Sequence, residues 1–292
     1  MPRPQLPPCM VTDLVFSPTG QQWSNGGTGF TNYERSESQT YSDGKSVLFD
    51  LYAPTSITVS GSVKPQVVYA MPVRNQTITL NGGGSMEGSM DLWKSQHGVL
   101  KVNIPMNYTG TTYISEGVLE ANTAIKGNVE LRARGTLAGN AVVEGTLTLE
   151  GALNYEGGRL MPGTATALGT LTLKKGLNIN KRLFAEMNIK DADATADLIH
   201  VEGDVSLFEN GTLVFTIVPD VDNPTPAEYK LLDYSGEWNG ATEQIVVRGL
   251  QGLSYNIVNK DKALWLVINA QRSPSEGVRW TGAKDNNWDY QR

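Results

Sequence analysis

Cysteine, histidine and charge are scarce in this sequence. Of its 292 residues one is cysteine and two are histidine, and 18% are charged. A single thiol, Cys9, excludes an intramolecular disulfide, and one cysteine with two histidines argues against a zinc site. Cys9 does not fit a lipid-anchored cysteine, because the residues before it (MPRPQLPP) contain no hydrophobic run.

Long apolar runs and basic clusters are also missing. No stretch approaches the roughly 20 apolar residues that span a bilayer, and no signal peptide is visible. The net charge is -6, and the basic residues are scattered, so the chain has no patch suited to nucleic acid. We therefore expect no membrane span and no nucleic-acid partner, and, if the protein is exported, a mature or excised fragment.

Glycine and β-favouring residues are abundant, with 31 glycines in the chain. Short runs with period-two alternation, such as residues 56–60 and 76–80, are bounded by Gly, Pro, Asn or Asp. These are strand signals, and no window holds a helical period long enough to predict a helix. The sequence therefore predicts an all-β protein with many turns.

A short repeat distinguishes a solenoid from a sandwich. Gly-Thr-Leu occurs at 135–137, 145–147, 169–171 and 211–213, and Gly-Val-Leu occurs at 98–100 and 117–119. In such a unit Gly turns the corner, Thr faces solvent, and Leu points inward onto the Leu of the next coil. The repeat predicts a right-handed parallel β-helix (β-solenoid).

Changes in amino-acid composition divide the chain into three parts. Residues 1–43 are rich in Pro, Gly and Ser and predict an irregular lead-in, with a short strand at 11–16. Residues 44–270 predict the β-solenoid module with its terminal cap. Residues 271–292 predict a linker and the start of a further module, because the segment with Trp280 and Trp288 is similar to the Trp-containing segment around Trp23.

The order of motifs resembles a known family. Residues 107–119 (NYTGTTYISEGVL), the Gly-rich corner at 80–88 and the segments at 158–163 and 197–203 resemble the autotransporter passenger-associated strand repeat family. The resemblance covers about three quarters of the chain. It implies a β cap at the C-terminal end, where residues 229–234 and 249–255 resemble the family's cap. It also implies a secreted or cell-surface bacterial protein whose partners are neighbouring modules of the same polypeptide.

Carboxylates and histidines offer little chemistry. Asp191, Asp193 and Asp197 cluster as weak metal candidates, but the bidentate Glu and central Gly of a calcium loop are missing, which favours a solvated loop. His97 and His200 have no partner at ligand spacing. No nucleophile elbow, P-loop or dinucleotide fingerprint is present. We predict no catalytic residue, no cofactor and no enzyme activity.

Aromatic side chains are the one positive hint of binding. Weak candidates for stacking on sugar rings are Trp93, Tyr108, Tyr113 and Trp238, although aromatics in solenoids more often fill the core or the caps. The main hypothesis is a non-catalytic structural or adhesive module. The alternative is a carbohydrate-contacting accessory module of a secreted glycan-degrading enzyme, on a cell-surface or dietary glycan. Third is a β-helix polysaccharide lyase or hydrolase, which fold analogy alone supports.

Overall fold

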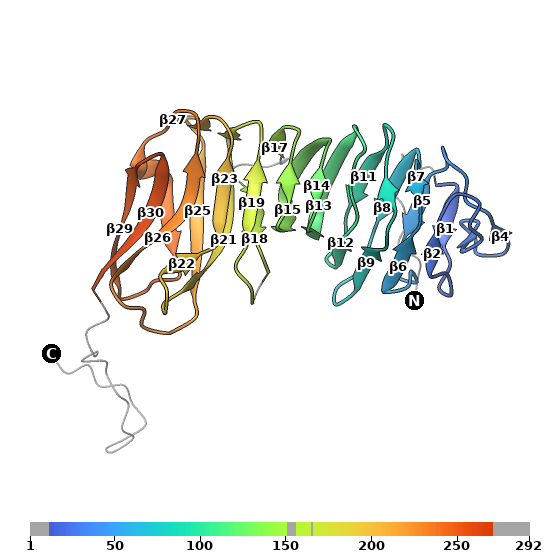
Figure 1. Cartoon of the computed structure of the whole chain (residues 1–292), viewed down its shortest axis with the longest axis horizontal. Helices are drawn as coiled ribbons and strands as arrows, with labels where there is room; N and C mark the ends of the chain where they lie inside the picture. The colour runs from blue at the N-terminus through green and yellow to red at the C-terminus, as the bar shows by residue number, and fades with distance from the viewer. Residues whose placement is uncertain (1–11, 151–155, 165, 271–292) are drawn as a thin grey trace, which may run out of the picture.

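The structure is a computed structural model in which residues 12–150, 156–164 and 166–270 are described. It is an elongated rod whose coils follow one another from the N-terminal to the C-terminal end (Figure 1). Regular structure is almost entirely β-strand, and neighbouring coils pair strand on strand in parallel. The predicted parallel β-solenoid is therefore confirmed. The described part contains a single helical turn, η1 (Thr242–Gln244).

Three long faces run along the rod, and each coil contributes strands to them. The first face is formed by β1 (Leu14–Phe16), β5 (Val47–Phe49), β8 (Val67–Ala70), β11 (Asp91–Lys94), the first halves of β13 (Thr111–Ala121) and β15 (Asn128–Gly139), and β17 (Leu147–Glu150). The second face is formed by β2 (Gln22–Trp23), β6 (Ser56–Val59), β9 (Thr77–Asn81), β12 (Val99–Val102), the second halves of β13 and β15, β18 (Glu156–Pro162), β21 (Arg182–Lys190), β25 (Thr212–Pro219) and β28 (Ile245–Arg248).

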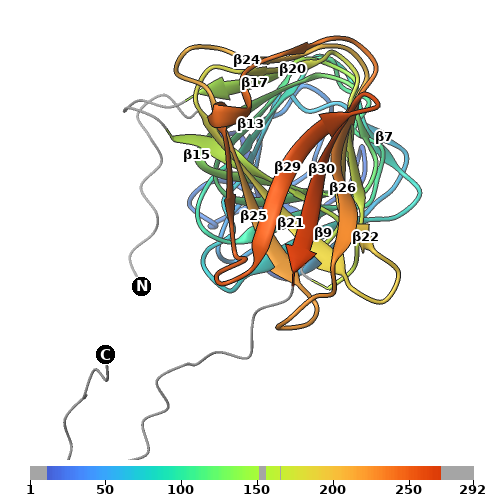
Figure 2. The same cartoon turned by 90° about the vertical axis from the view of Figure 1, so that its left-hand side faces the viewer.

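The third face closes the cross-section, and shorter strands complete the fold. The third face is formed by β7 (Ser62–Val63), β10 (Ser85–Met86), β14 (Ala124–Ile125), β16 (Val142–Val143), β19 (Thr170–Leu173), β23 (Leu198–Val201) and β26 (Ala227–Tyr234). A small sheet on the same side of the rod as β17 (Figure 2) is formed by β20 (Leu177–Ile179), β24 (Val205–Leu207) and β27 (Trp238–Asn239). The remaining strands are β3 (Phe30–Thr31), β4 (Ser38–Gln39), β22 (Thr195–Ala196), β29 (Ser254–Lys260) and β30 (Ala263–Ala270).

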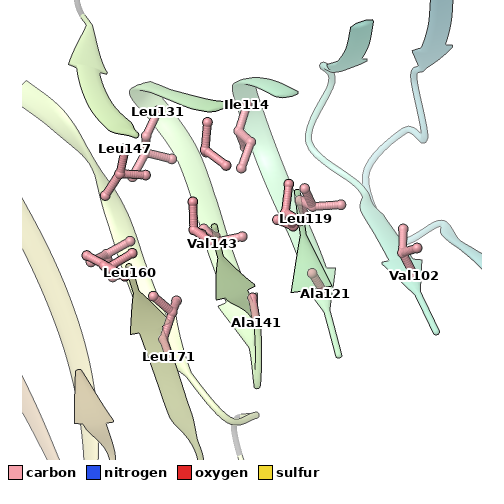
Figure 3. Close-up of a cluster of buried hydrophobic side chains, with 14 of the residues drawn as sticks. Val102, Ile114, Leu119, Ala121, Leu131, Ala141, Val143, Leu147, Leu160 and Leu171 are labelled. Carbon is pink, nitrogen blue, oxygen red and sulfur yellow. The ribbon is translucent and has the colours of Figure 1, made fainter. Parts of the chain in front are cut away.

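The core is built from files of apolar side chains that stack from coil to coil (Figure 3). On the second face the register aligns Leu100, Leu119, Leu137 and Leu160 in one file, and all four are fully buried. Burying a leucine side chain contributes about 1.5–3 kcal/mol, so such files supply much of the folding free energy. The prediction that the leucine of each repeat points inward is confirmed.

The Gly-Thr-Leu repeats occupy different corners of the cross-section. Leu137 pairs within the second face, Leu147 pairs with Val129 on the first face, and Leu171 pairs with Ile199 on the third face. One tripeptide therefore serves at three corners, because each corner needs a turn followed by an inward apolar residue. This explains why the spacing of the later repeats is irregular.

Glycine at these corners is required mainly by close approach of coils. A Cβ atom at Gly135 would lie 2.1 Å from the carbonyl oxygen of Ile114 in the preceding coil. Gly117 has φ of +69° as well, a conformation that an L side chain rarely adopts. Close approach of the coils therefore requires glycine at both corners, and the left-handed backbone is a further reason at Gly117.

The N-terminal end is a folded cap where the sequence predicts an irregular lead-in. Within the described residues, β1 pairs in parallel with β5 and antiparallel with β3, so the first coil begins well before residue 44. The cap is closed by mutually contacting aromatic rings, with centroids 4.7–5.6 Å apart: Phe16, Trp23, Phe30, Tyr41 and Phe49. The short strand predicted at 11–16 is present as β1, and the sequence did not reveal the aromatic packing because the rings are widely spaced in Pro- and Gly-rich sequence.

The C-terminal end is closed by an antiparallel sheet. β30 pairs with β26 on one side and with β29 on the other, which ends the parallel ladder of the third face. The predicted terminal β cap is therefore confirmed. Residues 271–292, where the sequence predicts a linker and a further module, lie outside the described residues.

A ladder of asparagines runs along one corner and was not predicted. The Nδ2 group of Asn103 donates to Oδ1 of Asn81 at 2.8 Å, and Nδ2 of Asn122 donates to Oδ1 of Asn103 at 3.0 Å. The Oδ1 atom of Asn140 then accepts the backbone N–H of Thr170 at 3.0 Å. These bonds link coils outside the apolar core and oppose slippage of one coil against the next.

Candidate functional site

Two of the predicted aromatic candidates lie side by side on the outer surface. Trp93 of β11 and Tyr113 of β13 are register partners, and their rings stack with centroids 4.0 Å apart and an interplanar angle of 17°. The guanidinium of Arg132 lies 5.4 Å from the Trp93 ring and 5.7 Å from the Tyr113 ring. Because these distances are nearly equal, Arg132 lies beside the stack and covers its flank.

This stack is the exposed end of an outer apolar stripe. Tyr69 is the register partner of Trp93 one coil earlier, and Leu48 is the partner of Tyr69. Tyr69 and Leu48 belong to a second hydrophobic cluster, outside the main core, against which Trp93 packs. One face of each ring is thus covered by the other ring, and Trp93 also packs on the second cluster, so the pair is better suited to joining coils than to stacking on a sugar.

The other two aromatic candidates lie elsewhere. Tyr108 is fully buried, and its hydroxyl is 2.5 Å from Oγ1 of Thr112, so the sequence-based suggestion that it contacts a ligand is wrong. Burial raises the pKa of the Tyr108 hydroxyl. Trp238 lies near the C-terminal end, 5.8 Å from the Tyr234 ring, and its Nε1 donates to the Gly240 carbonyl at 3.0 Å.

The three aspartates perform separate structural tasks. Asp197 is fully buried and accepts N–H groups from Gly169 at 2.8 Å and from Asn188 at 2.7 Å. Burial raises the pKa of the Asp197 carboxyl, although these hydrogen bonds oppose the rise. The Asp191 carboxylate accepts hydrogen bonds from the backbone N–H and the hydroxyl of Thr225. The Asp193 carboxylate accepts a hydrogen bond from the hydroxyl of Thr195 in the same loop.

The described residues contain no group of three or more His, Cys, Asp or Glu arranged to hold a metal ion. The expectation of a solvated loop fits Asp191 and Asp193, whose hydrogen bonds lie in exposed surroundings. It does not fit Asp197, which fastens the turn before β19 to β21 from inside the fold.

A buried lysine was missed by the sequence analysis. Lys94 points into the rod, has no exposed surface, and donates from Nζ to the carbonyl oxygens of Ser95, Gln96 and Glu116 at 3.0, 2.8 and 2.8 Å. Three acceptors match the three N–H bonds of an ammonium group. Burial lowers the pKa of Lys94 to about 7, and the nearby Glu116 carboxylate opposes that shift.

Lys94 could have been found from the strand pattern. In the run 91–94 Leu92 is inward, and period-two alternation puts Lys94 inward as well. A lysine at an inward strand position is rare unless it is paired. Its partners could not be foreseen, because they converge at a bulge between Ile114 and Glu116.

Both histidines lie on the surface beside a carboxylate. Nδ1 of His97 is 3.4 Å from the Glu116 carboxylate, and Nδ1 of His200 is 2.5 Å from the Asp233 carboxylate. The side chains of His97 and His200 are 49% and 39% exposed. The His200–Asp233 pair links β23 to β26 of the next coil, whereas His97 lies in the turn between β11 and β12 and reaches Glu116 of β13.

A hollow in the described surface lies between β17 and β20. This groove, of about 590 Å³, is lined by Thr146, Leu147, Thr148, Leu149, Glu150, Asn178, Asn180, Phe208, Glu209 and Asn210. We call it the β17–β20 groove. Sequence reasoning did not identify it, because it forms where two strands distant in the chain fail to pair.

Comparison with known proteins adds no assignment. No protein-family model matches the chain, and no curated protein matches its sequence. The resemblance to autotransporter passenger repeats therefore stays a prediction. Within the described residues, no helix is both long and apolar enough to cross a membrane.

Proposed function

We propose that this chain is a non-catalytic structural or adhesive β-solenoid module of a larger secreted or cell-surface bacterial protein. The observation that supports it best is the way in which the chain uses its side chains. Inward positions are filled by apolar files, and the candidate reactive groups Lys94, Tyr108 and Asp197 are buried in hydrogen bonds between or within coils.

The shape of the molecule supports the same proposal. Because each coil contacts its neighbours, a simple repeated sequence can build a capped rod with a long surface. Such a rod suits a spacer or a display surface. Polar links such as the asparagine ladder keep the coils in register outside the core. A rod of this kind holds flanking modules at a fixed separation.

The resemblance to autotransporter repeats supports the location and the partners that we propose. On that basis the module is exposed on the bacterial surface or secreted, and it joins neighbouring modules of the same polypeptide. The Trp93–Tyr113 stack gives little support to the accessory carbohydrate alternative at that position, because the two rings use one face each on each other and both side chains are half-buried.

Two measurements test the proposal. Brief protease treatment of intact cells should remove the module from the cell surface while cytosolic proteins survive, or the module should be found in the medium. Purified full-length chain should release no product from a broad panel of polysaccharides. Turnover that disappears on replacing one carboxylate would refute the non-catalytic role, and a module protected inside intact cells would refute the location.

A further inference from the structure

The first-face ladder stops at β17. β17 pairs with β15 on one side, and β20 pairs with β24, but no ladder joins β17 to β20 in the described part of the chain. Leu147 and Leu149 are 3% and 2% exposed, whereas Val129 and Leu131 in the preceding coil are fully buried. The missing ladder thus leaves a hollow with an apolar floor, which is the β17–β20 groove.

A rigid aromatic ring stands at the edge of this groove. Phe208 is 52% exposed, more than any other large hydrophobic residue described. Its backbone N–H donates to the Ile179 carbonyl at 2.9 Å, and its own carbonyl accepts from Gly211 at 2.8 Å and from Gln244 at 2.7 Å. Exposing a phenylalanine on so firmly held a turn has no evident packing purpose, so the ring is presented to solvent.

The remaining walls of the groove are polar. The exposed carboxamides of Asn178, Asn180 and Asn210 make no hydrogen bond within the described residues, and each offers both a donor and an acceptor. The carboxylate of Glu150, which lies 3.7 Å from Nζ of Lys181, and the carboxylate of Glu209 add acceptors at the rim. Groups that both donate and accept match the hydroxyl groups of a sugar, which do the same.

We propose that the β17–β20 groove binds an oligosaccharide chain, with the Phe208 ring against an apolar sugar face and the three asparagines on its hydroxyl groups. A groove of about 590 Å³ is within the range of small-molecule sites. The inference deepens the adhesive part of the proposed function and rests on it.

An extended peptide is a poorer occupant. Inserting a strand between β17 and β20 needs about 9.6 Å between the flanking strands, twice the ordinary spacing of ~4.8 Å. Residue pairs from β17 and β20 already have Cα atoms within 8 Å of each other. A peptide therefore cannot complete the ladder without pushing the coils apart, whereas a sugar can lie on the groove from outside.

The test uses the full 292-residue chain on a glycan array, followed by calorimetric titration with the best oligosaccharide. Phe208→Ala and Asn178→Ala should each weaken binding tenfold or more, without lowering the melting temperature, because both side chains are exposed. Tyr52→Ala, at an aromatic that is 39% exposed near the other end of the rod, should leave binding unchanged.

The possible results separate this inference from the proposed function. No binding to any glycan, or equal binding by the wild type and Phe208→Ala, would overturn the groove and leave the rod as a structural module. Binding to extended peptides in place of glycans would also overturn it. Product release from the bound oligosaccharide would instead overturn the non-catalytic role.

Discussion

Replacing Gly135 with alanine tests how closely the coils approach. The new Cβ would lie 2.1 Å from the Ile114 oxygen and 2.8 Å from its carbonyl carbon, which are backbone atoms that cannot rotate away. Relief requires the coils to separate by about 1 Å, which strains the β13–β15 ladder. Overpacking costs about 1–3 kcal/mol and each weakened hydrogen bond about 1 kcal/mol, so we expect about 3 kcal/mol in all.

The matched control is the same substitution at Gly83. A Cβ at Gly83 has no atom within 4 Å, and its φ is not in the left-handed region. Alanine there should change stability by no more than about 0.5–1 kcal/mol, with stabilisation the favoured sign, because it restricts the unfolded chain. Comparing the two separates steric overlap from the general effect of removing a glycine.

Thermal unfolding followed by circular dichroism and by tryptophan fluorescence measures both variants. A cost of about 3 kcal/mol corresponds to a fall of about 6–12 °C in melting temperature for a domain of this size, while the Gly83 variant should stay within about 3 °C. Transitions that coincide for the two probes justify a single free energy. A Gly135→Ala melting temperature within about 2 °C of wild type would refute the close-approach argument.

Three further predictions test the assignment of side chains to the inside and the outside. Leu137→Asp should lower the free energy of unfolding by about 4 kcal/mol or more, because it buries an unpaired carboxylate. Thr136→Asp, at the preceding and partly exposed position, should melt close to wild type. Equal melting temperatures for the two variants would contradict the assignment of Leu137 to the inside. Lys94 has a folded-state pKa of about 7, whereas its ordinary value is 10.5. Between these two pH values the unfolded chain binds more protons than the folded chain. The free energy of unfolding should therefore rise with pH, by at most about 1.4 kcal/mol per pH unit. Melting temperatures from about pH 7.5 to about pH 9.5 should therefore climb in the wild type and stay flat in Lys94→Met, and parallel curves would contradict the shift. Trp93→Ala should cost about 1–3 kcal/mol in urea unfolding by removing its stack on Tyr113, yet leave glycan binding unchanged, and lost binding would make the stack a ligand site.

The core of the rod was predictable because its period is local. Alternation and the recurring tripeptide place Leu119, Leu137 and Leu171 inward without any knowledge of the neighbouring coil. The sequence did not show that Leu137 and Leu171 belong to different faces, because equivalent turns recur at every corner. A short stretch of sequence is therefore enough to predict which side chains point inward. Predicting which residues pair between coils also requires the length of each coil.

The features that the sequence did not reveal depend on contacts between coils. The Lys94 site needs carbonyls from two coils, and the β17–β20 groove needs two strands that fail to pair. The asparagine ladder did leave a trace, since Asn81, Asn103 and Asn122 are spaced by one coil length each. Alignment of the coils one below another would have exposed it.

The interruption between β17 and β20 also has a mechanical meaning. Elsewhere in the N-terminal half the first and second faces of neighbouring coils are both joined by ladders, but at this boundary the first face is interrupted and the coils are joined through β18–β21 and β19–β23. The β18–β21 pairing is itself irregular between Glu156 and Arg159. Under tension along its axis, a rod of stacked coils opens where the fewest backbone bonds resist, so this one should extend first at its middle. Its two ends would then separate as intact halves.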